Sequence, residues 1–240
     1  MQGKTALVTG ASSGIGLATT QALLARGYNV VATSRTASRT PHLKASPQLV
    51  VIDGDVGDAA TAERAIAAAR ARFGGLDLLV NNAGTFMAKP FTEYTAQDYA
   101  QLLATNLAGF FHMTQHALRQ MTAAKGGHIV NVGTSLAGQP IQGVPSALPI
   151  LIKGGIEAAT RSLSIEYASA SIRVNTIAAG IIDTPMHSPD NHPFLETLSP
   201  SRRLGRASEI ADAVLYLDGA AFVSGEILHL DGGAHAGKWS

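Results

Sequence analysis

The chain has 240 residues, of which 46% are hydrophobic and 15% are charged, so it can bury a sizeable core and is not expected to be disordered. Its 18 Lys and Arg residues nearly balance 17 Asp and Glu residues, which leaves a formal charge of +1. That balance gives no electrostatic reason to expect nucleic acid or an anionic membrane as a partner. Cysteine is absent, which excludes disulfides, thiolate metal sites and a cysteine nucleophile.

Two further features bear on the location of the protein. No uninterrupted apolar run reaches the ~18 residues expected of a membrane span. The sequence MQGKTALVTG leads straight into a predicted strand, without the basic, apolar and small-residue segments of an export signal. We therefore expect a cytoplasmic protein that binds neither nucleic acid nor a membrane, and no residue pattern indicates a metal site.

Short apolar runs alternate with longer helix-like stretches along the whole chain, a pattern typical of βαβ units in a parallel sheet. The runs lack apolar–polar alternation, as expected for strands that are covered on both faces. Strands are predicted at residues 6–8, 29–31, 49–51, 78–80, 128–130, 173–177 and 227–230. Helices are predicted at residues 59–73 and 92–121, among others. The prediction is one α/β domain over residues 1–240, a Rossmann-type doubly wound parallel sheet of about seven strands between two helical layers.

A turn rich in glycine and serine follows the first predicted strand and precedes a helix that begins near Ile15. Its sequence, TGASSGIG, has the glycine spacing G-x-x-x-G-x-G, a variant of the commoner G-x-G-x-x-G. Such a turn lets backbone N–H groups approach a pyrophosphate at the positive end of the helix dipole. The predicted dinucleotide site therefore includes Gly10, Ser12, Ser13, Gly14, Ile15 and Gly16.

The end of the second predicted strand indicates which dinucleotide is bound. Proteins that prefer NAD usually carry Asp or Glu about 20 residues beyond the turn, where the carboxylate bonds the ribose hydroxyl. This strand instead ends in Ser34 and Arg35. A hydroxyl and a guanidinium suit a 2′-phosphate, so we predict NADP(H) rather than NAD(H). The alternative is that Arg35 is simply a solvated residue after a strand.

Several other motifs occur in the order found in the short-chain dehydrogenase/reductase superfamily, which the chain resembles over nearly its whole length. Besides the glycine turn, they are DV at 55–56, NNAG at 81–84, TNL at 105–107, NVGTSLAG at 131–138, RVN at 173–175, LGR at 204–206 and DGG at 231–233. The resemblance implies further cofactor contacts at Asp55, Val56, Asn82, Ala83, Gly84, Lys153, Gly180, Ile182 and Thr184.

The resemblance also implies the catalytic residues. In this family a serine orients the substrate oxygen, a tyrosine donates the proton, a lysine binds the ribose and lowers the pKa of the phenol, and an asparagine holds a water. In this chain the serine, lysine and asparagine are Ser135, Lys153 and Asn106. Ser135 is preferred to Thr134 because Gly138 then follows three residues later, as in the family.

One departure from the family lies four residues before Lys153, where the tyrosine is expected and the chain has Pro149. No tyrosine occurs in residues 105–166, so a small shift of the alignment does not supply one. A proton could then come from a water relayed through Lys153, or from His187 or His192, because imidazole titrates near neutral pH. The alternative is that both histidines are ordinary loop residues.

Three functions are compatible with these residues. The first is an NADP(H)-dependent oxidoreductase that acts on a small alcohol or carbonyl substrate with a non-standard proton donor. The alternative is a catalytically impaired binding protein, a pseudoenzyme that uses NADP(H) as a structural or sensing ligand. A non-redox reaction in the same pocket ranks last, because it needs an acid or base that the sequence does not identify.

Two segments are expected to shape the substrate pocket. Residues 185–201 contain four prolines, which disfavour regular secondary structure, and a loop of that length is usually a lid or binding loop. A mobile surface excursion is the alternative for this segment. Residues 136–148 form the second segment. The resemblance further implies a homodimer or homotetramer, paired through helices near residues 98–121 and 153–167.

Overall fold

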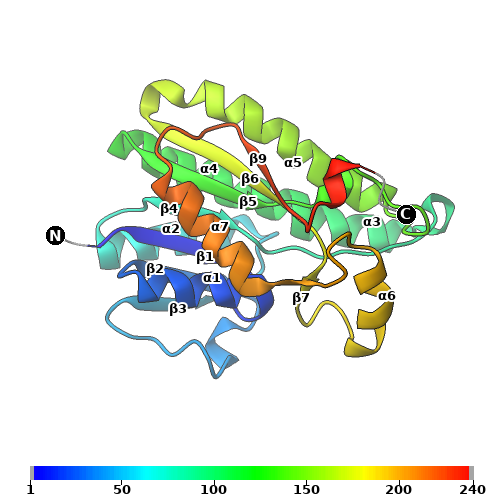
Figure 1. The fold of residues 1–240 in the computed structure, drawn as a ribbon. Coiled ribbons are helices and arrows are strands. Elements are labelled where there is room, and N and C mark those ends of the chain that lie inside the picture. The colour runs from blue at the N-terminus through cyan, green and yellow to red at the C-terminus, as the bar shows by residue number, and fades with distance from the viewer. Residues whose placement is uncertain (1–2, 238–240) are drawn as a thin grey trace.

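A computed structural model describes residues 3–237 of the chain. Seven parallel strands form one sheet in the order β3-β2-β1-β4-β5-β6-β9, with helices on both faces (Figure 1). The predicted fold class is therefore confirmed. The strands are β1 (Thr5–Thr9), β2 (Asn29–Ser34), β3 (Leu49–Asp53), β4 (Leu78–Asn81), β5 (Gly127–Val132), β6 (Ile172–Ala179) and β9 (Ile227–Leu230).

A separate pair of strands, β7 (Ile182–Asp183) and β8 (Gly205–Arg206), brings the segment after β6 beside the start of the last long helix. No sequence pattern predicts this pair, because two-residue strands carry no periodicity. The helices are α1 (Gly14–Ala25), α2 (Ala59–Phe73), α3 (Ala96–Leu102), α4 (Gly109–Ala124), α5 (Ala147–Glu166), α6 (His192–Thr197) and α7 (Ala207–Gly219). Within residues 3–237, no helix combines the length and apolar character needed to cross a bilayer.

The predicted helix at residues 59–73 matches α2, whereas the one at residues 92–121 is divided. It begins later, because Thr95 caps α3 in a capping box with Asp98. A π-helical segment, Leu103–Ala108, then joins α3 to α4, which ends at Ala124. Hydrophobic periodicity gives no warning of such a π-helical insertion, and these insertions often occur at functional sites.

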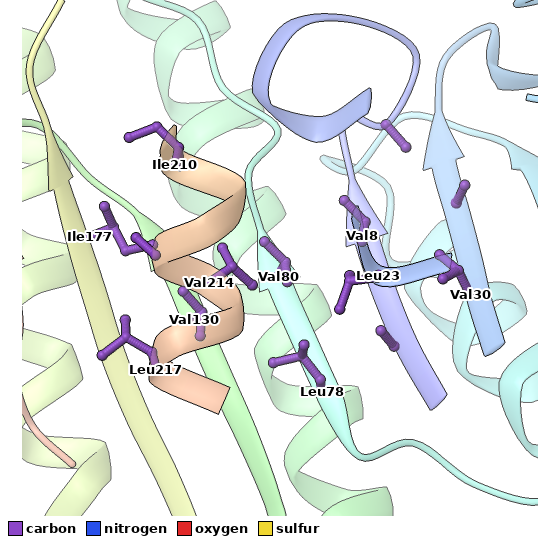
Figure 2. Close-up of a cluster of buried hydrophobic side chains, with 14 of the residues drawn as sticks. Val8, Leu23, Val30, Leu78, Val80, Val130, Ile177, Ile210, Val214 and Leu217 are labelled. Atoms are coloured by element: carbon purple, nitrogen blue, oxygen red, sulfur yellow. The ribbon is translucent and has the colours of Figure 1, made fainter. Parts of the chain in front are cut away.

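The hydrophobic core lies on both faces of the sheet, which explains why the strands lack alternation. Consecutive residues Leu7 and Val8 of β1 are both fully buried. Val8 belongs to a cluster with Leu23 of α1 and Val214 of α7, as Figure 2 shows. In Figure 1, α1 and α7 lie in front of the sheet. Leu7 belongs to a second cluster, formed with α2 and α4.

A buried polar network lies at the amino ends of β5 and β6. His128 Nδ1 lies 3.2 Å from Asp218 Oδ1, and Asn175 Nδ2 lies 3.0 Å from His128 Nε2. Asn175 Oδ1 accepts a hydrogen bond from the backbone N–H of Glu226, so its Nδ2 must be the donor to His128. His128 is therefore neutral, with its proton on Nδ1 directed at Asp218. Tyr28 also donates to the Asp218 carboxylate.

Replacement of Asp218 by asparagine is expected to lower the free energy of unfolding by about 3 kcal/mol, because it leaves several buried donors without their charged acceptor. Lys4 Nζ, 2.9 Å from Asp218 Oδ2, also loses its partner. Urea denaturation of the variant and of Asp212→Asn, an exposed position on the same helix, measures this difference. Equal destabilisation of the two variants would contradict a stabilising network.

The same network predicts acid sensitivity. Burial alone raises the pKa of Asp218, but hydrogen bonds from His128, Tyr28 and Lys4 outweigh it and hold that pKa below its usual value of 3.8. Burial lowers the pKa of His128 below its usual value of 6.5. Both groups bind protons more readily when unfolded, so stability falls as pH drops below 6.5 and again below 3.8. The difference between wild type and D218N is expected to shrink below pH 4, which denaturation at several pH values tests.

Candidate active site

The sheet order reverses beside β1 and β4, the position where such sheets bind ligands beyond the carboxyl ends of their strands. A cavity of about 370 Å³ opens there. Its lining includes most of the residues that the sequence assigns to a cofactor. They are Gly10, Ser12, Ser13, Gly14, Ile15, Ser34, Arg35, Asp55, Val56, Asn82, Ala83, Gly84, Lys153, Gly180, Ile182 and Thr184. The remaining one, Gly16, does not line the cavity.

The conformation of the glycine turn explains its sequence. Gly10 and Gly14 have φ angles of +65° and +51°, in the left-handed region that favours glycine. Gly16 lies beneath the turn, where an added Cβ would stand 2.2 Å from the carbonyl oxygen of Gly10. Gly16 therefore permits close packing of the start of α1 against the turn, and its place in the cofactor site stays a prediction.

The turn is fixed to the end of β4. The Thr9 hydroxyl accepts hydrogen bonds from the backbone N–H groups of Asn82 and Ala83, at 3.0 and 2.9 Å. Asn82 Nδ2 donates in return to the Thr9 carbonyl at 2.9 Å and to the Gly10 carbonyl at 3.3 Å. These bonds hold the ends of β1 and β4 together as one wall of the cavity.

The end of β2 supplies a hydroxyl and a guanidinium to the cavity. The Ser34 hydroxyl is buried and has no hydrogen-bond partner among the described residues, while Arg35 is exposed at the rim. Asp53, the register partner of Ser34 on β3, accepts a hydrogen bond from the Ser38 N–H at 2.8 Å. The Ser38 bonds lower the pKa of Asp53 below its usual value of 3.8. An unpartnered buried hydroxyl next to a guanidinium fits a phosphate-bearing ribose.

Lys153 of α5 reaches the cavity beside β5. Its Nζ lies 3.4 Å from the Val132 carbonyl oxygen and 3.5 Å from that of Gly133, so both hydrogen bonds are long. Burial lowers the pKa of Lys153 from 10.5 to about 8, and the charge of Glu157 opposes that shift. Lys153 is thus a cation that can release a proton near neutral pH.

Asn106 lies in the π-helical segment and faces a second, smaller cavity. Its amide group donates to the Thr85 carbonyl at 3.0 Å and accepts from the Thr85 N–H at 2.9 Å. The small cavity has a volume of about 20 Å³ and is lined by Asn106, Asn131 and Lys153, among others. That volume is enough for about one water. Asn106 does not line the large cavity, and Lys153 lines both, together with Val56, Ala83 and Val132.

Ser135 and Thr134 both line the large cavity, and their environments differ. The Thr134 hydroxyl accepts a hydrogen bond from the Leu136 N–H at 3.4 Å and caps a short 3₁₀ turn. The Ser135 hydroxyl has no hydrogen-bond partner within residues 3–237, although the residue is 96% buried. Ser135 is therefore the residue whose hydroxyl is available to a ligand.

Pro149 is the third residue of α5 and is buried. Because the first N–H groups of a helix have no intrahelical acceptor, proline costs no hydrogen bond there. The first bond of α5 runs from the N–H of Ile150 to the carbonyl of Ser146 at 3.0 Å. Pro149 does not line the cavity, and no tyrosine of the described chain does.

The segment at residues 185–201 is more regular than the sequence indicated. It holds a 3₁₀ turn at Pro189–Asn191 and the short helix α6. Pro193 lies in the first turn of α6, where its missing N–H has no cost, so prolines here start a helix and do not prevent one. His187 lines the cavity, whereas His192 does not and lies 3.7 Å from Asp183.

Leu136 and Ile141 of the predicted segment 136–148 line the cavity, as do Met186 and Leu198 of the predicted segment 185–201. Phe86 also lines it, and no sequence pattern indicated that residue. Asp231 also lines the cavity, and its carboxylate accepts hydrogen bonds from the N–H groups of Gly233 and His235. Only the DGG motif signalled Asp231, since the loop residues follow no spacing rule.

The parallel sheet, its switch point and the glycine turn define a Rossmann-type dinucleotide-binding protein. Residues 10–235 match the family model described as enoyl-(acyl carrier protein) reductase, and the chain belongs to the short-chain dehydrogenase/reductase superfamily that was expected. It is 35% identical to the 3-oxoacyl-[acyl-carrier-protein] reductase FabG of Escherichia coli (strain K12), over 98% of each chain.

Two other similarities point the same way. The chain is 36% identical to the cis-4-hydroxycyclohexanecarboxylate dehydrogenase of Sinomonas cyclohexanicum, over 96% of each chain. The solved structure of ElxO with NADP bound superposes with a TM-score of 0.90 and 28% identity, covering 98% of this chain and 100% of that chain. The chain is thus an oxidoreductase of the short-chain dehydrogenase/reductase type by family.

Proposed function

We propose that this protein is an NADP(H)-dependent oxidoreductase that interconverts a carbonyl compound and the corresponding alcohol. The observation that carries the proposal is that Ser135 and Lys153 open onto the cavity formed by the glycine turn. The bound nicotinamide supplies the hydride, and the protein has to position the substrate oxygen and supply its proton.

The cofactor proposal rests on the end of β2. Ser34 offers a buried hydroxyl without a partner, and Arg35 offers a guanidinium that pairs with phosphate in charge-assisted hydrogen bonds. The bound NADP of ElxO supports the same choice, because its fold matches this one closely. NAD(H) would leave Arg35 without an anionic partner.

Replacement of Arg35 by alanine is expected to weaken NADPH binding about 10–100-fold, as loss of one hydrogen-bonded charge pair of about 1.5–3 kcal/mol implies. NADH binding should change little. Fluorescence titration with both nucleotides measures the ratio, and Arg39→Ala, an exposed arginine outside the cavity lining, is the matched control. An equal loss for NADPH and NADH would argue against a 2′-phosphate contact.

The proposed proton donor is non-standard. The Ser135 hydroxyl holds the substrate oxygen, and the Lys153 ammonium gives that oxygen a proton directly or through one water. The small cavity beside Asn106 is also lined by Lys153 and offers a place for a water that restores the proton. His187 is a second candidate acid, although burial and the charge of His192 lower its pKa below 6.5, which reduces its protonated fraction at neutral pH.

The proposed substrates are 3-oxoacyl thioesters, because the relative FabG is a 3-oxoacyl-[acyl-carrier-protein] reductase and the cavity lining includes the apolar side chains of Phe86, Ile141 and Leu198. Residues 185–201 form the proposed substrate loop of a single domain. A homodimer or homotetramer is the proposed assembly, with exposed Phe111 of α4 and Leu151 of α5 as apolar contacts between copies.

A second candidate function, a pseudoenzyme that binds NADP(H) without turnover, is favoured by Pro149. One experiment separates the two. Purified protein is first titrated with NADPH by calorimetry, and NADPH oxidation is then followed with a panel of 3-oxoacyl thioesters and small ketones. Oxidation above background supports the reductase. Tight binding without any oxidation supports the pseudoenzyme, and absence of binding contradicts both.

A further inference from the structure

Glu157 is a half-buried acid that the proposed reaction does not use. It follows Lys153 by four residues on α5, so the two side chains leave the same face of the helix. Its Oε1 atom is buried and has no hydrogen-bond partner among the described residues. Burial raises the pKa of Glu157 above 4.5, against the charges of Arg161 and Lys153. A buried carboxyl oxygen without a hydrogen-bond partner is uncommon and calls for a physical explanation.

The side chains of Lys153 and Glu157 both lie close to Gly133. Lys153 Nζ contacts the Gly133 carbonyl oxygen, and Glu157 Oε1 lies 3.4 Å from where a Cβ on Gly133 would stand. Glu157 thus flanks the same residue of the β5 end that Lys153 touches. The two hydrogen bonds of Lys153 are long, so its own contacts stabilise the ammonium only weakly.

We propose that Glu157 is a positioning residue of this site, whose carboxylate keeps Lys153 in its ammonium form and so maintains the proton supply. The proposal rests on the proposed function only where it refers to the reaction, because the protonation of Lys153 is a property of the free protein. Glu157 itself does not line the cavity and acts through Lys153.

The elements packed against α5 carry few charges, so Glu157 is the principal charged group that acts on the Lys153 ammonium. The segments packed against α5 are β6, the π-helical segment and the 3₁₀ turns Ser135–Ala137 and Ala168–Ala170. Of these, only β6 contains a charged residue, Arg173, and its guanidinium is bonded to carbonyl groups near the far end of the sheet. Arg161, one turn further along α5, is the other charge that acts on Glu157.

The test measures the protonation of Lys153 without cofactor or substrate. Trace acetylation with acetic anhydride at a series of pH values, followed by mass spectrometry of the peptide that carries Lys153, gives the titration midpoint of its amine. The wild-type midpoint is expected near pH 8. In Glu157→Gln, which keeps the size and removes the charge, the midpoint is expected to fall by about one pH unit.

Glu166→Gln is the matched control, because it makes the same chemical change on an exposed residue of the same helix. It should leave the midpoint unchanged. Glu157→Asp retains the carboxylate but withdraws it by one methylene, so a smaller decrease is expected. The alkaline limb of the kcat/KM profile should move with the midpoint in each variant that turns over substrate.

An unchanged midpoint in folded Glu157→Gln would overturn the proposal. If that variant fails to fold, as judged by circular dichroism, Glu157→Asp decides, and an unchanged midpoint there overturns it equally. A shifted midpoint in a protein that oxidises no NADPH would support the role of Glu157 and contradict the reductase instead. The two proposals therefore fail by different observations.

Discussion

Replacement of Pro149 by tyrosine is expected to raise the rate of carbonyl reduction by about 10²–10⁴-fold, the contribution typical of a positioned general acid. Residue 149 lies one helical turn before Lys153 on the same helix face. A tyrosine there would stand one helical turn from Lys153, the spacing that the family uses for its proton-donating tyrosine and its lysine. Stopped-flow measurement of NADPH oxidation at saturating substrate gives the rate.

The backbone of α5 accommodates this change, because residue 149 lies in the first turn, where an additional N–H needs no intrahelical acceptor. Pro149→Phe is the matched control. It introduces the same ring into the same buried position without a titratable hydroxyl. A tyrosine variant no faster than the phenylalanine variant would show that the missing phenol does not limit the reaction.

Replacement of Lys153 by methionine is expected to lower kcat/KM by at least ~10²-fold, because the proposed proton donor is removed while the side-chain volume is nearly kept. NADPH should also bind more weakly, since Lys153 lines the cofactor cavity. Lys44→Met removes an exposed lysine and serves as the control.

The stability of the Lys153→Met variant provides a separate readout. Burial disfavours the ammonium, so its removal should preserve or raise the melting temperature while activity is lost. Thermal unfolding of the wild type and variant, beside their kinetics, separates a functional lysine from a structural one. Undiminished turnover in a folded Lys153→Met would rule out Lys153 as the proton source and direct attention to His187.

The sequence predicts the sheet well because its strands are buried on both faces. Leu7 and Val8 are both apolar and pack into different clusters on the two faces of the sheet. Strand β1 therefore appears in the sequence as a continuous apolar run. The prolines of residues 185–201 were harder to interpret. Proline forbids the interior of a helix but suits its first turn, so Pro193 is compatible with α6.

Only some residues of the candidate site could be predicted from the sequence. Glycines at residues 10 and 14 are predictable because a local turn requires them. Phe86, Ile141 and Leu198 line the cavity through the tertiary arrangement of loops, which no spacing rule describes. The partners of Asp218 were also missed, because His128 and Tyr28 lie far from it in sequence and meet it only in the folded protein.

Reduction of a carbonyl group in this cavity without a tyrosine can be observed directly. Purified protein is incubated with NADPH carrying deuterium at C4 of the nicotinamide and with a 3-oxoacyl thioester, and the product is analysed by mass spectrometry. The predicted result is a 3-hydroxyacyl thioester one mass unit heavier than the unlabelled alcohol. Recovery of unreduced thioester from a solution in which the protein demonstrably binds NADPH would contradict the account.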